Sequence, residues 1–397
     1  MRDSSAERGC SPDSVTRIWR PTELEIAAGA VVGFLEESPE LPVERLQPRV
    51  VVAEIIRDAL LAPPCYVSFS GGRDSSVILA IALDVARREG LQFPIPITNR
   101  YPGVDGAEED YWQELVIRHL GIKEWVILHR REDADLLGSA GTEGLRRFGV
   151  LWPAPIFLAK TIEETARGGT VVTGEGGDEY LGHRRLSTLR LALQNPFAVR
   201  RGLSGAASAM IPTELIRQSR KRAFALDAVP WLKNPFREAF LDHLAHEMVE
   251  PRNSRRALVR LLSRRSPAMG SANRAAIARQ RNVSYVDPLS HPRLAASIAW
   301  KYGWLGPAGR TQLFRREFGT LLPDEIISRQ SKAFFNHAYF GPDTRAFVAE
   351  WDGTGVDPSM VDADSLRLAW QQPLIAPQTA LLLQSAWLHQ NSGRSHP

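Results

Sequence analysis

The sequence predicts an α/β fold, with a doubly wound parallel sheet followed by a mostly helical C-terminal part. Three observations lead to this prediction. Short apolar runs with β-branched residues alternate with helical patterns in the first half of the chain. Glycine-rich turns follow two of these runs, at residues 70–76 and 174–179. From Leu186 onward the strand signals vanish. This alternation favours parallel strands, with a ligand at their carboxyl ends.

Length and composition are those of an ordinary globular protein. The 397 residues exceed one typical domain, and 44% of them are hydrophobic and 24% charged. We expect an N-terminal helical or irregular segment (1–60), an α/β domain (61–185) and a helical part (186–397). No apolar run is long enough to span a bilayer. The two cysteines, Cys10 and Cys65, indicate a reducing, cytoplasmic setting. The net charge of +4 suits a phosphate-rich ligand without requiring nucleic acid.

Each element is predicted from apolar spacing and from the glycine or proline at its ends. Helical spacing covers residues 23–36 and 46–61, and Pro63-Pro64 ends the second helix. Strands are predicted over 66–69, 93–98, 125–128 and 170–173. The helices between them are predicted over 75–88, 110–120 and 156–167, each ended by a glycine. The many arginines between Arg252 and Arg265 are interpreted as a solvated helical face rather than a binding patch.

The turn after the first predicted strand reads Ser70-Gly71-Gly72-Arg73-Asp74-Ser75-Ser76. A helix start presents unpaired N–H groups and the positive end of a dipole, so this turn suits an anion. The two glycines allow close approach of the backbone, the three serines add hydroxyl donors, and the aspartate suits Mg²⁺ bound to phosphates. The simpler interpretation is a well-capped turn. The combination within seven residues favours a nucleotide phosphate site, although it is neither a Walker loop nor a dinucleotide fingerprint.

The turn after the fourth predicted strand is acidic and reads Gly174-Glu175-Gly176-Gly177-Asp178-Glu179. The carboxyl ends of parallel strands meet at one edge of a sheet, so both turns should face the same crevice. Asp74 and Asp178 would then share a Mg²⁺ ion that bridges nucleotide phosphates. A solvent-exposed loop is the alternative for such a turn, and the preceding apolar strand counts against it.

The first turn resembles the pyrophosphate loop (PP-loop) of the ATP pyrophosphatases, the adenine nucleotide alpha hydrolase-like fold, with Arg73 in a variable slot. The two turns together resemble the synthetase domain of asparagine synthetases and their relatives, the β-lactam synthetases and lasso-peptide cyclases. Three later segments are similar to motifs of that family. They are Tyr285-Val286-Asp287-Pro288-Leu289, Leu313-Phe314-Arg315-Arg316, and the stretch 322–332 with one extra residue before its lysine.

The resemblance implies an ATP-dependent, AMP-forming ligase that adenylates a carboxylate and then forms an amide, with ATP and Mg²⁺ as its cofactors. Lys332 matches a lysine of the family that stabilises negative charge. Glu175 matches a catalytic glutamate of asparagine synthetases, where β-lactam synthetases have a tyrosine. Asp74 and Asp178 would hold Mg²⁺. The expected ATP contacts are Ser70, Gly71, Gly72, Asp74, Ser75, Ser76, Gly174 and Thr98, the last at a position where the family reads adenine.

One departure from the family concerns the nitrogen source. Glutamine-dependent asparagine synthetases begin with a glutaminase whose nucleophile is the cysteine after Met1, and here Arg2 follows Met1. We therefore expect no glutamine hydrolysis by this chain. Nitrogen would come from free ammonia, a separate glutaminase or an amine on the substrate. Aspartate, a β-amino acid and a precursor peptide remain open as substrates. A tRNA-modifying PP-loop enzyme and a degenerate non-catalytic subunit are the alternatives.

Overall fold

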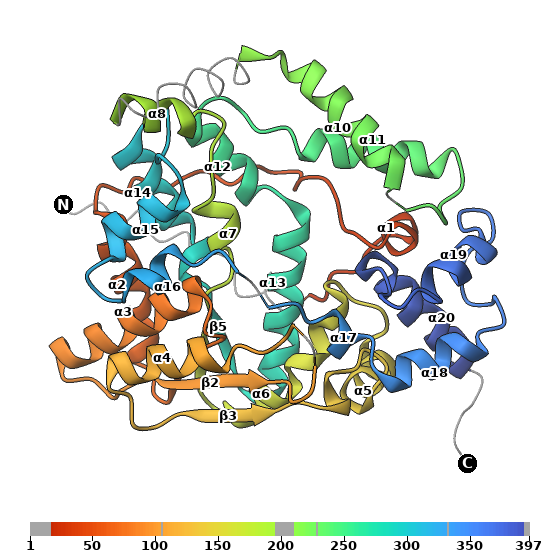
Figure 1. Cartoon of the computed structure of the whole chain (residues 1–397), viewed down its shortest axis with the longest axis horizontal. Coiled ribbons are helices and arrows are strands. Elements are labelled where there is room, and N and C mark those ends of the chain that lie inside the picture. Colours follow the sequence, from red (N-terminus) through yellow and green to blue (C-terminus); the bar gives the residue numbers. More distant parts are fainter. Residues whose placement is uncertain (1–16, 105, 195–209, 228, 332, 393–397) are drawn as a thin grey trace, which may run out of the picture.

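All five strands of the sheet run parallel, and their order places the functional turns. The computed structural model describes residues 17–104, 106–194, 210–227, 229–331 and 333–392. The strand order is β3-β2-β1-β4-β5. The strands are β1 (Cys65–Ser68), β2 (Ile95–Arg100), β3 (Val126–His129), β4 (Thr170–Val172) and β5 (Ser284–Val286), of which Figure 1 labels β2, β3 and β5. The α/β fold with a parallel sheet is thus confirmed. The order reverses between β1 and β4, where doubly wound sheets bind their ligands.

The fifth strand corrects the prediction that strands end at Leu186. β5 lies far along the chain and pairs with β4 in register, from Thr170 opposite Ser284 to Val172 opposite Val286. With three residues it is too short to show the two-residue alternation by which strands are recognised in a sequence. The helical C-terminal part therefore also contributes an edge strand to the sheet.

Helices cover both faces of the sheet because successive strand side chains point to opposite sides. Cys65 and Val67 pack in a core with α2 (Pro48–Leu60), α3 (Arg73–Glu89), α4 (Asp110–Leu120) and α14 (Pro292–Tyr302). On the other face Ile97 and Val171 pack with α6 (Lys160–Thr165) and α13 (Arg265–Ala278). The fold is therefore doubly wound, as predicted.

A third core is formed by helices away from the sheet, with the buried Trp370 packed edge-on against Trp351 at 4.6 Å between ring centroids. Two of its helices differ from the prediction. The first stops at Ala28 rather than residue 36, because Gly29 ends it in the left-handed conformation (φ 70°). Another, α5, was not predicted. The helices of this core include α1 (Glu23–Ala28), α5 (Ser139–Phe148), α11 (Phe236–Glu247), α18 (Pro342–Glu350), α19 (Ala363–Trp370) and α20 (Ala380–Ser392).

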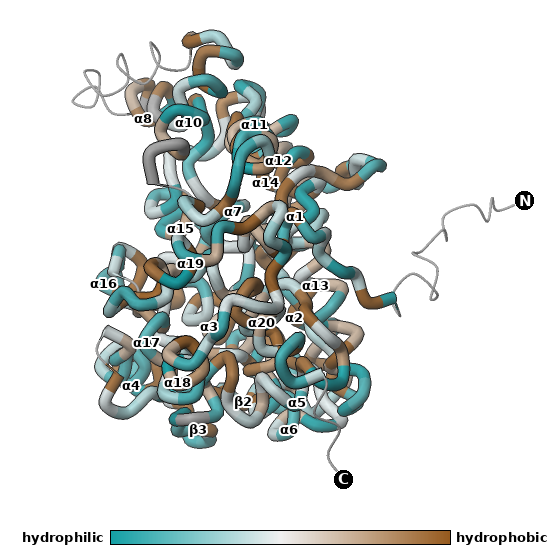
Figure 2. The backbone as a smooth tube through the Cα atoms, turned by 90° about the vertical axis from the view of Figure 1, so that its right-hand side faces the viewer, coloured by the Kyte–Doolittle hydropathy of each residue, from teal (hydrophilic) through white to brown (hydrophobic). Residues whose placement is uncertain are grey.

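The remaining elements are mostly helical, in agreement with the predicted C-terminal part. Figure 2, turned by 90° from Figure 1, shows α8, α10 and α11 at one end of the molecule and β3, α5 and α6 at the other. Within the described residues no helix is both long and apolar enough to cross a membrane. The further helices are α7 (Gly177–Tyr180), α8 (Ser187–Gln194), α10 (Thr213–Asp227), α12 (Ser254–Leu262), α15 (Arg310–Phe318), α16 (Asp324–Ser328) and α17 (Asn336–Tyr339), and 3₁₀ turns lie at Glu132–Ala134, Ala154–Ala159, Arg279–Arg281, Pro288–Ser290 and Pro377–Thr379.

The arginines between residues 252 and 265 do not form one solvated face. Arg255 and Arg256 are exposed on α12, in keeping with the prediction. Arg265, in contrast, forms an ion pair with the buried Glu25 at 2.5 Å. That pair joins α13 to α1 and has a structural role.

Candidate active site

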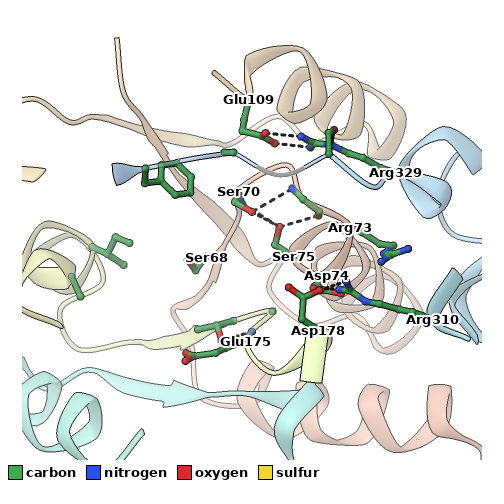
Figure 3. Close-up of a pocket in the computed structure, with 18 of the residues that line it drawn as sticks. Ser68, Ser70, Arg73, Asp74, Ser75, Glu109, Glu175, Asp178, Arg310 and Arg329 are labelled. Carbon is green, nitrogen blue, oxygen red and sulfur yellow. Dashed lines mark hydrogen bonds and ion pairs between the residues drawn. The ribbon is translucent and has the colours of Figure 1, made fainter. Parts of the chain in front are cut away.

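A cavity of about 490 Å³ lies beside the phosphate loop and the acidic turn, at the point where the strand order reverses. Its size suits a nucleotide-sized ligand. Its walls include the loop after β1, the turn after β4, α13, the start of α15 and the segment after α16 (Figure 3). The predicted site residues that line it are Ser70, Gly72, Asp74, Ser75, Gly174, Glu175 and Asp178.

Serine hydroxyls give the phosphate loop its shape. The helix α3 begins at Arg73, with Gly72 as its N-cap, two residues earlier than predicted. The Ser75 hydroxyl accepts from the Ser70 N–H at 3.2 Å, and the Ser70 hydroxyl accepts from the Gly72 N–H at 3.3 Å. Ser76 is buried, and its hydroxyl donates to the Gly72 carbonyl at 2.7 Å. Ser76 therefore supports the loop from below, while Ser70 and Ser75 face the cavity.

The two glycine-rich turns touch each other, and this contact requires glycine on the second turn. A Cβ at Gly174 would lie 2.7 Å from the Ser75 nitrogen, and one at Gly177 would lie 2.4 Å from the Asp74 carboxyl carbon. Because contacts under 3.0 Å are not tolerated, any other residue would push the turns apart. These glycines set the spacing of Asp74 and Asp178.

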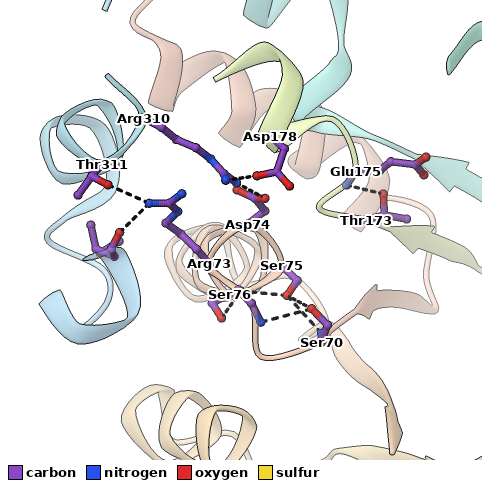
Figure 4. A network of polar contacts seen from close by, with 12 residues as sticks. Ser70, Arg73, Asp74, Ser75, Ser76, Thr173, Glu175, Asp178, Arg310 and Thr311 are labelled. Carbon is purple, nitrogen blue, oxygen red and sulfur yellow. Dashed lines mark hydrogen bonds and ion pairs between the residues drawn. The ribbon is translucent and has the colours of Figure 1, made fainter. Parts of the chain in front are cut away.

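Asp74 and Asp178 share one cation, the guanidinium of Arg310. Its Nη2 donates to Asp74 and its Nη1 to Asp178 (Figure 4). Arg310 is the first residue of α15, and its side chain is 15% exposed. The two carboxylates therefore meet at a single positive charge, an arginine that the sequence did not suggest, and the Mg²⁺ ion expected between them stays a prediction.

The residues present also fit a magnesium ion that arrives with a nucleotide. Mg²⁺ usually binds one or two carboxylates together with phosphate oxygens and waters. Among the described residues, no group of three or more acidic, histidine or cysteine side chains could hold a metal by itself. Asp74 Oδ1 is buried without a hydrogen-bond partner, a state that calls for a missing ligand. The pair thus suits an ion completed by the substrate.

Glu175 belongs to a second polar network. Its carboxylate accepts from Arg274 Nη1, and Arg274 Nη2 donates to Asp287. Burial acts against the charge of Arg274, but the nearby Asp287 and Glu175 outweigh it and raise its pKa. The Thr173 hydroxyl donates to Asp287 at 2.5 Å and accepts from the Glu175 N–H at 3.1 Å. Arg274 also stacks on Tyr285, with 4.7 Å from its guanidinium carbon to the ring centroid. The network orients Glu175, whose side chain is 62% exposed.

A buried ion pair supports the phosphate loop from the other side. Arg329 donates to both carboxylate oxygens of Glu109 at 2.5 Å, with side-chain exposures of 4% and 8%. The same guanidinium donates to the Gly71 carbonyl at 3.0 Å and lies over the Trp112 ring at 4.5 Å. Figure 3 shows this pair on the opposite side of the loop from Asp74 and Arg310. Arg329 therefore ties the segment after α16 to the phosphate loop.

Two predicted residues need separate comment. Thr98 is fully buried and does not line the cavity; its hydroxyl donates to the Phe69 carbonyl at 2.8 Å and accepts from Trp125 Nε1 at 2.9 Å. Its hydroxyl therefore has a structural role, and the adenine contact expected of Thr98 stays a prediction. Lys332 lies outside the described residues, and its neighbours Ser331 and Ala333 line the cavity.

Sequence reasoning missed four charged residues of this site. Arg329 stood within the stretch 322–332 but received no role, and Glu109, Arg274 and Arg310 carried no motif signal. Each finds its partner through a contact between distant parts of the chain; Arg310 and Asp74, for example, are 236 positions apart. The four become visible only when the sheet is assembled.

The fold and the site first define a class of protein. A doubly wound parallel sheet, with a glycine- and serine-rich loop at its switch point and an acidic turn opposite, is a nucleotide-binding α/β domain of the PP-loop type. Residues 61–201 match the family model described as asparagine synthase. Residues 61–201 therefore carry a domain of the asparagine synthase type, whose family members are in general ATP-dependent amide-bond ligases. A comparison with curated proteins found no significant match.

Proposed function

We propose that this protein is an AMP-forming ligase that joins a carboxylate to an amine. In the first step a carboxylate oxygen of the substrate bonds to the α-phosphorus of ATP. The bond between the α-phosphorus and the oxygen that bridges the α- and β-phosphates breaks, and pyrophosphate is released. In the second step the amine nitrogen bonds to the acyl carbon, the amine loses a proton and AMP leaves. The observation that carries this proposal is the meeting of Asp74 and Asp178 at one cation beside the phosphate loop.

Different residues of the cavity would bind the phosphates, hold the metal and accept the proton. The start of α3 with Ser70 and Ser75 would bind phosphate oxygens, since first-turn N–H groups have no partner within the helix. Asp74 and Asp178 would hold Mg²⁺, which when bound neutralises charge on the departing pyrophosphate. Arg274 orients Glu175 by donating to its carboxylate, so that Glu175 can accept the proton of the amine. Lys332 would add a positive charge near the α-phosphate, a role that rests on the family resemblance.

Aspartate or a peptide-like substrate suits this chain better than a β-amino acid. Glu175 stands where β-lactam synthetases keep a tyrosine, which counts against closure of a β-amino acid. Aspartate with ammonia, and a peptide or small molecule in biosynthetic tailoring, remain candidates. A separate glutaminase or a precursor peptide would be the corresponding partner.

The test is a pyrophosphate-release screen with MgATP over aspartate, amino-acid and peptide carboxylates, with ammonium as the common nitrogen donor. Asp74→Asn should abolish carboxylate-dependent release because it removes a charged ligand of the Mg²⁺ ion. Lys332→Ala should do the same because it removes positive charge complementary to the phosphates. Asp324→Asn serves as control, since Asp324 is exposed and pairs with Arg315 on the surface. Full activity in both site variants would refute the proposal.

A further inference from the structure

A second cavity of about 250 Å³ adjoins the nucleotide cavity and shares Glu175 and Arg274 with it. It lies between α7 and α13, and the loop at Trp152 and Pro153 forms another wall. Figure 3 shows Glu175 in the nucleotide cavity, on the turn that leads into α7. A ligand in the second cavity would therefore meet the nucleotide cavity at Glu175, the proposed proton acceptor.

The second cavity is far larger than ammonia requires. A water molecule, which is close to ammonia in size, takes about 30 Å³ in the liquid, roughly one eighth of this volume. Trp152 and Tyr180 supply aromatic surface, and Gly270 and Ser271 of α13 leave one side without bulky side chains. The space suits an organic molecule of about the size of an amino acid or short peptide.

The charges around the second cavity favour a cation. Four carboxylates line it, Glu175, Glu179, Glu247 and Asp287, against two arginines, Arg264 and Arg274. Glu175 and Asp287 share one arginine. Glu247 pairs with Arg264 at 3.4 Å and accepts from the Gly33 N–H at 2.8 Å. Within the described part of the chain, the exposed carboxylate of Glu179 forms no hydrogen bond or ion pair, so it is open to an ammonium group.

Arg274 indicates which group accompanies the ammonium. Its Nε–H is a buried donor that makes no hydrogen bond, whereas Arg264 Nε already lies 3.4 Å from a carboxylate oxygen of Glu247. A buried donor without a partner is costly, and a carbonyl or carboxylate oxygen would satisfy it. An ammonium beside a carbonyl oxygen, on a body with some apolar surface, is the pattern of an amino acid or a peptide N-terminus.

We propose that the second cavity binds the amine substrate, and that this substrate is a primary amine on an amino-acid or peptide body rather than free ammonia. The inference rests on the proposed function for the reaction that follows. The bound ammonium first loses one proton to solvent and becomes a neutral amine. As the amine nitrogen then bonds to the acyl carbon, it gives a second proton to Glu175, the acyl–phosphate oxygen bond breaks and AMP leaves. Glu179 is a positioning residue that holds the ammonium before the first proton is lost.

Ligand-observed saturation-transfer NMR on the full chain, without nucleotide, tests the site directly. The probes are alanyl-alaninamide and its N-acetyl derivative, which differ in the primary amine. The free amine should bind at least tenfold more tightly than the acetylated probe. Ser271→Trp, which fills the cavity from α13, and Glu179→Gln, which keeps size and removes charge, should each weaken binding of the free amine at least tenfold. Thermal melting checks that both variants are folded.

Equal binding of the two probes, no effect of either variant, or no saturation transfer to the free amine would overturn the inference. Binding of ATP to the same samples separates this result from a failure of the proposed function. A protein that binds ATP but neither probe keeps the ligase proposal and loses the amine site. A protein that binds the free amine selectively but not ATP keeps the amine site and loses the ligase proposal.

Discussion

Removing the carboxylate of Glu109 should destabilise the protein by an amount that the structure lets us anticipate. Glu109→Ala leaves the Arg329 guanidinium 4% exposed and without its two hydrogen bonds of 2.5 Å. Breaking a buried pair by deleting one partner costs about 3–5 kcal/mol, because the remaining charge is left uncompensated. With a urea m value of about 3 kcal/mol/M, the unfolding midpoint would fall by about 1–1.7 M. Glu109→Gln, which keeps an acceptor, should fall between this variant and the wild type.

The chain offers a matched control for the Glu109 variant. Arg315 and Asp324 also form a two-bond pair, with both contacts at 2.7 Å, but on the exposed surface. Because solvent screens such a pair, Asp324→Ala should leave the urea midpoint unchanged within error. ATP affinity should also drop in Glu109→Ala alone, since Arg329 holds the Gly71 carbonyl. Equal midpoint shifts in the two alanine variants would refute the reasoning.

Three further outcomes follow from single side chains. Arg310→Ala removes the cation between the carboxylates of Asp74 and Asp178. Mn²⁺, used as a probe for Mg²⁺, should then bind the nucleotide-free protein several-fold more tightly, as measured by calorimetry. Weaker binding would contradict a competition between the arginine and the metal. Burial lowers the pKa of His291, so the unfolded chain binds more protons below about pH 6.5 and stability falls as pH drops from there through the folded pKa. His291→Asn keeps the N-cap of α14 and should reduce the loss of urea midpoint between pH 7.5 and 5.5. Burial raises the pKa of Cys65 to about 12, so little of its thiol is in the reactive thiolate form at pH 8. In a Cys10→Ser background, the thiol of the native protein should therefore react with a disulfide reagent at least about 100-fold more slowly than that of the unfolded protein.

Much of the fold could be predicted because its signals are local. The strand, turn and helix around Ser70–Ser76 are encoded by neighbouring apolar, glycine and serine residues, and the structure places them within two residues of the prediction. The helix α5 escaped prediction because Gly141 and Gly144 weaken its helical pattern. Gly144 is explained by packing, since a Cβ there would lie 2.3 Å from the Phe157 ring. A tertiary contact thus overrides a local preference.

The site was predictable only on its nucleotide-facing side. Asp74, Glu175 and Asp178 lie in glycine-rich motifs whose carboxylates indicate a phosphate and metal site, and all three line the cavity. Arg274 and Arg310, which neutralise them, could not be found, because arginine is abundant in this chain and their partners are distant in sequence. Thr98 was expected at the adenine because it lies at a strand end, and the structure shows that its hydroxyl bonds inside the protein.

The pairing of β5 with β4 has a consequence for how the protein is made. Val172 and its partner Val286 are 114 positions apart, so the last edge of the sheet closes long after the phosphate loop has been synthesised. At about 5–20 residues per second, a ribosome needs roughly 6–23 s to pass from Val172 to Val286. During that time the open side of β4 offers unpaired backbone groups to other chains, a state that promotes aggregation. A nascent chain would gain its complete nucleotide site only near the end of translation, and a fragment ending at residue 201 would retain the phosphate loop with an open sheet edge.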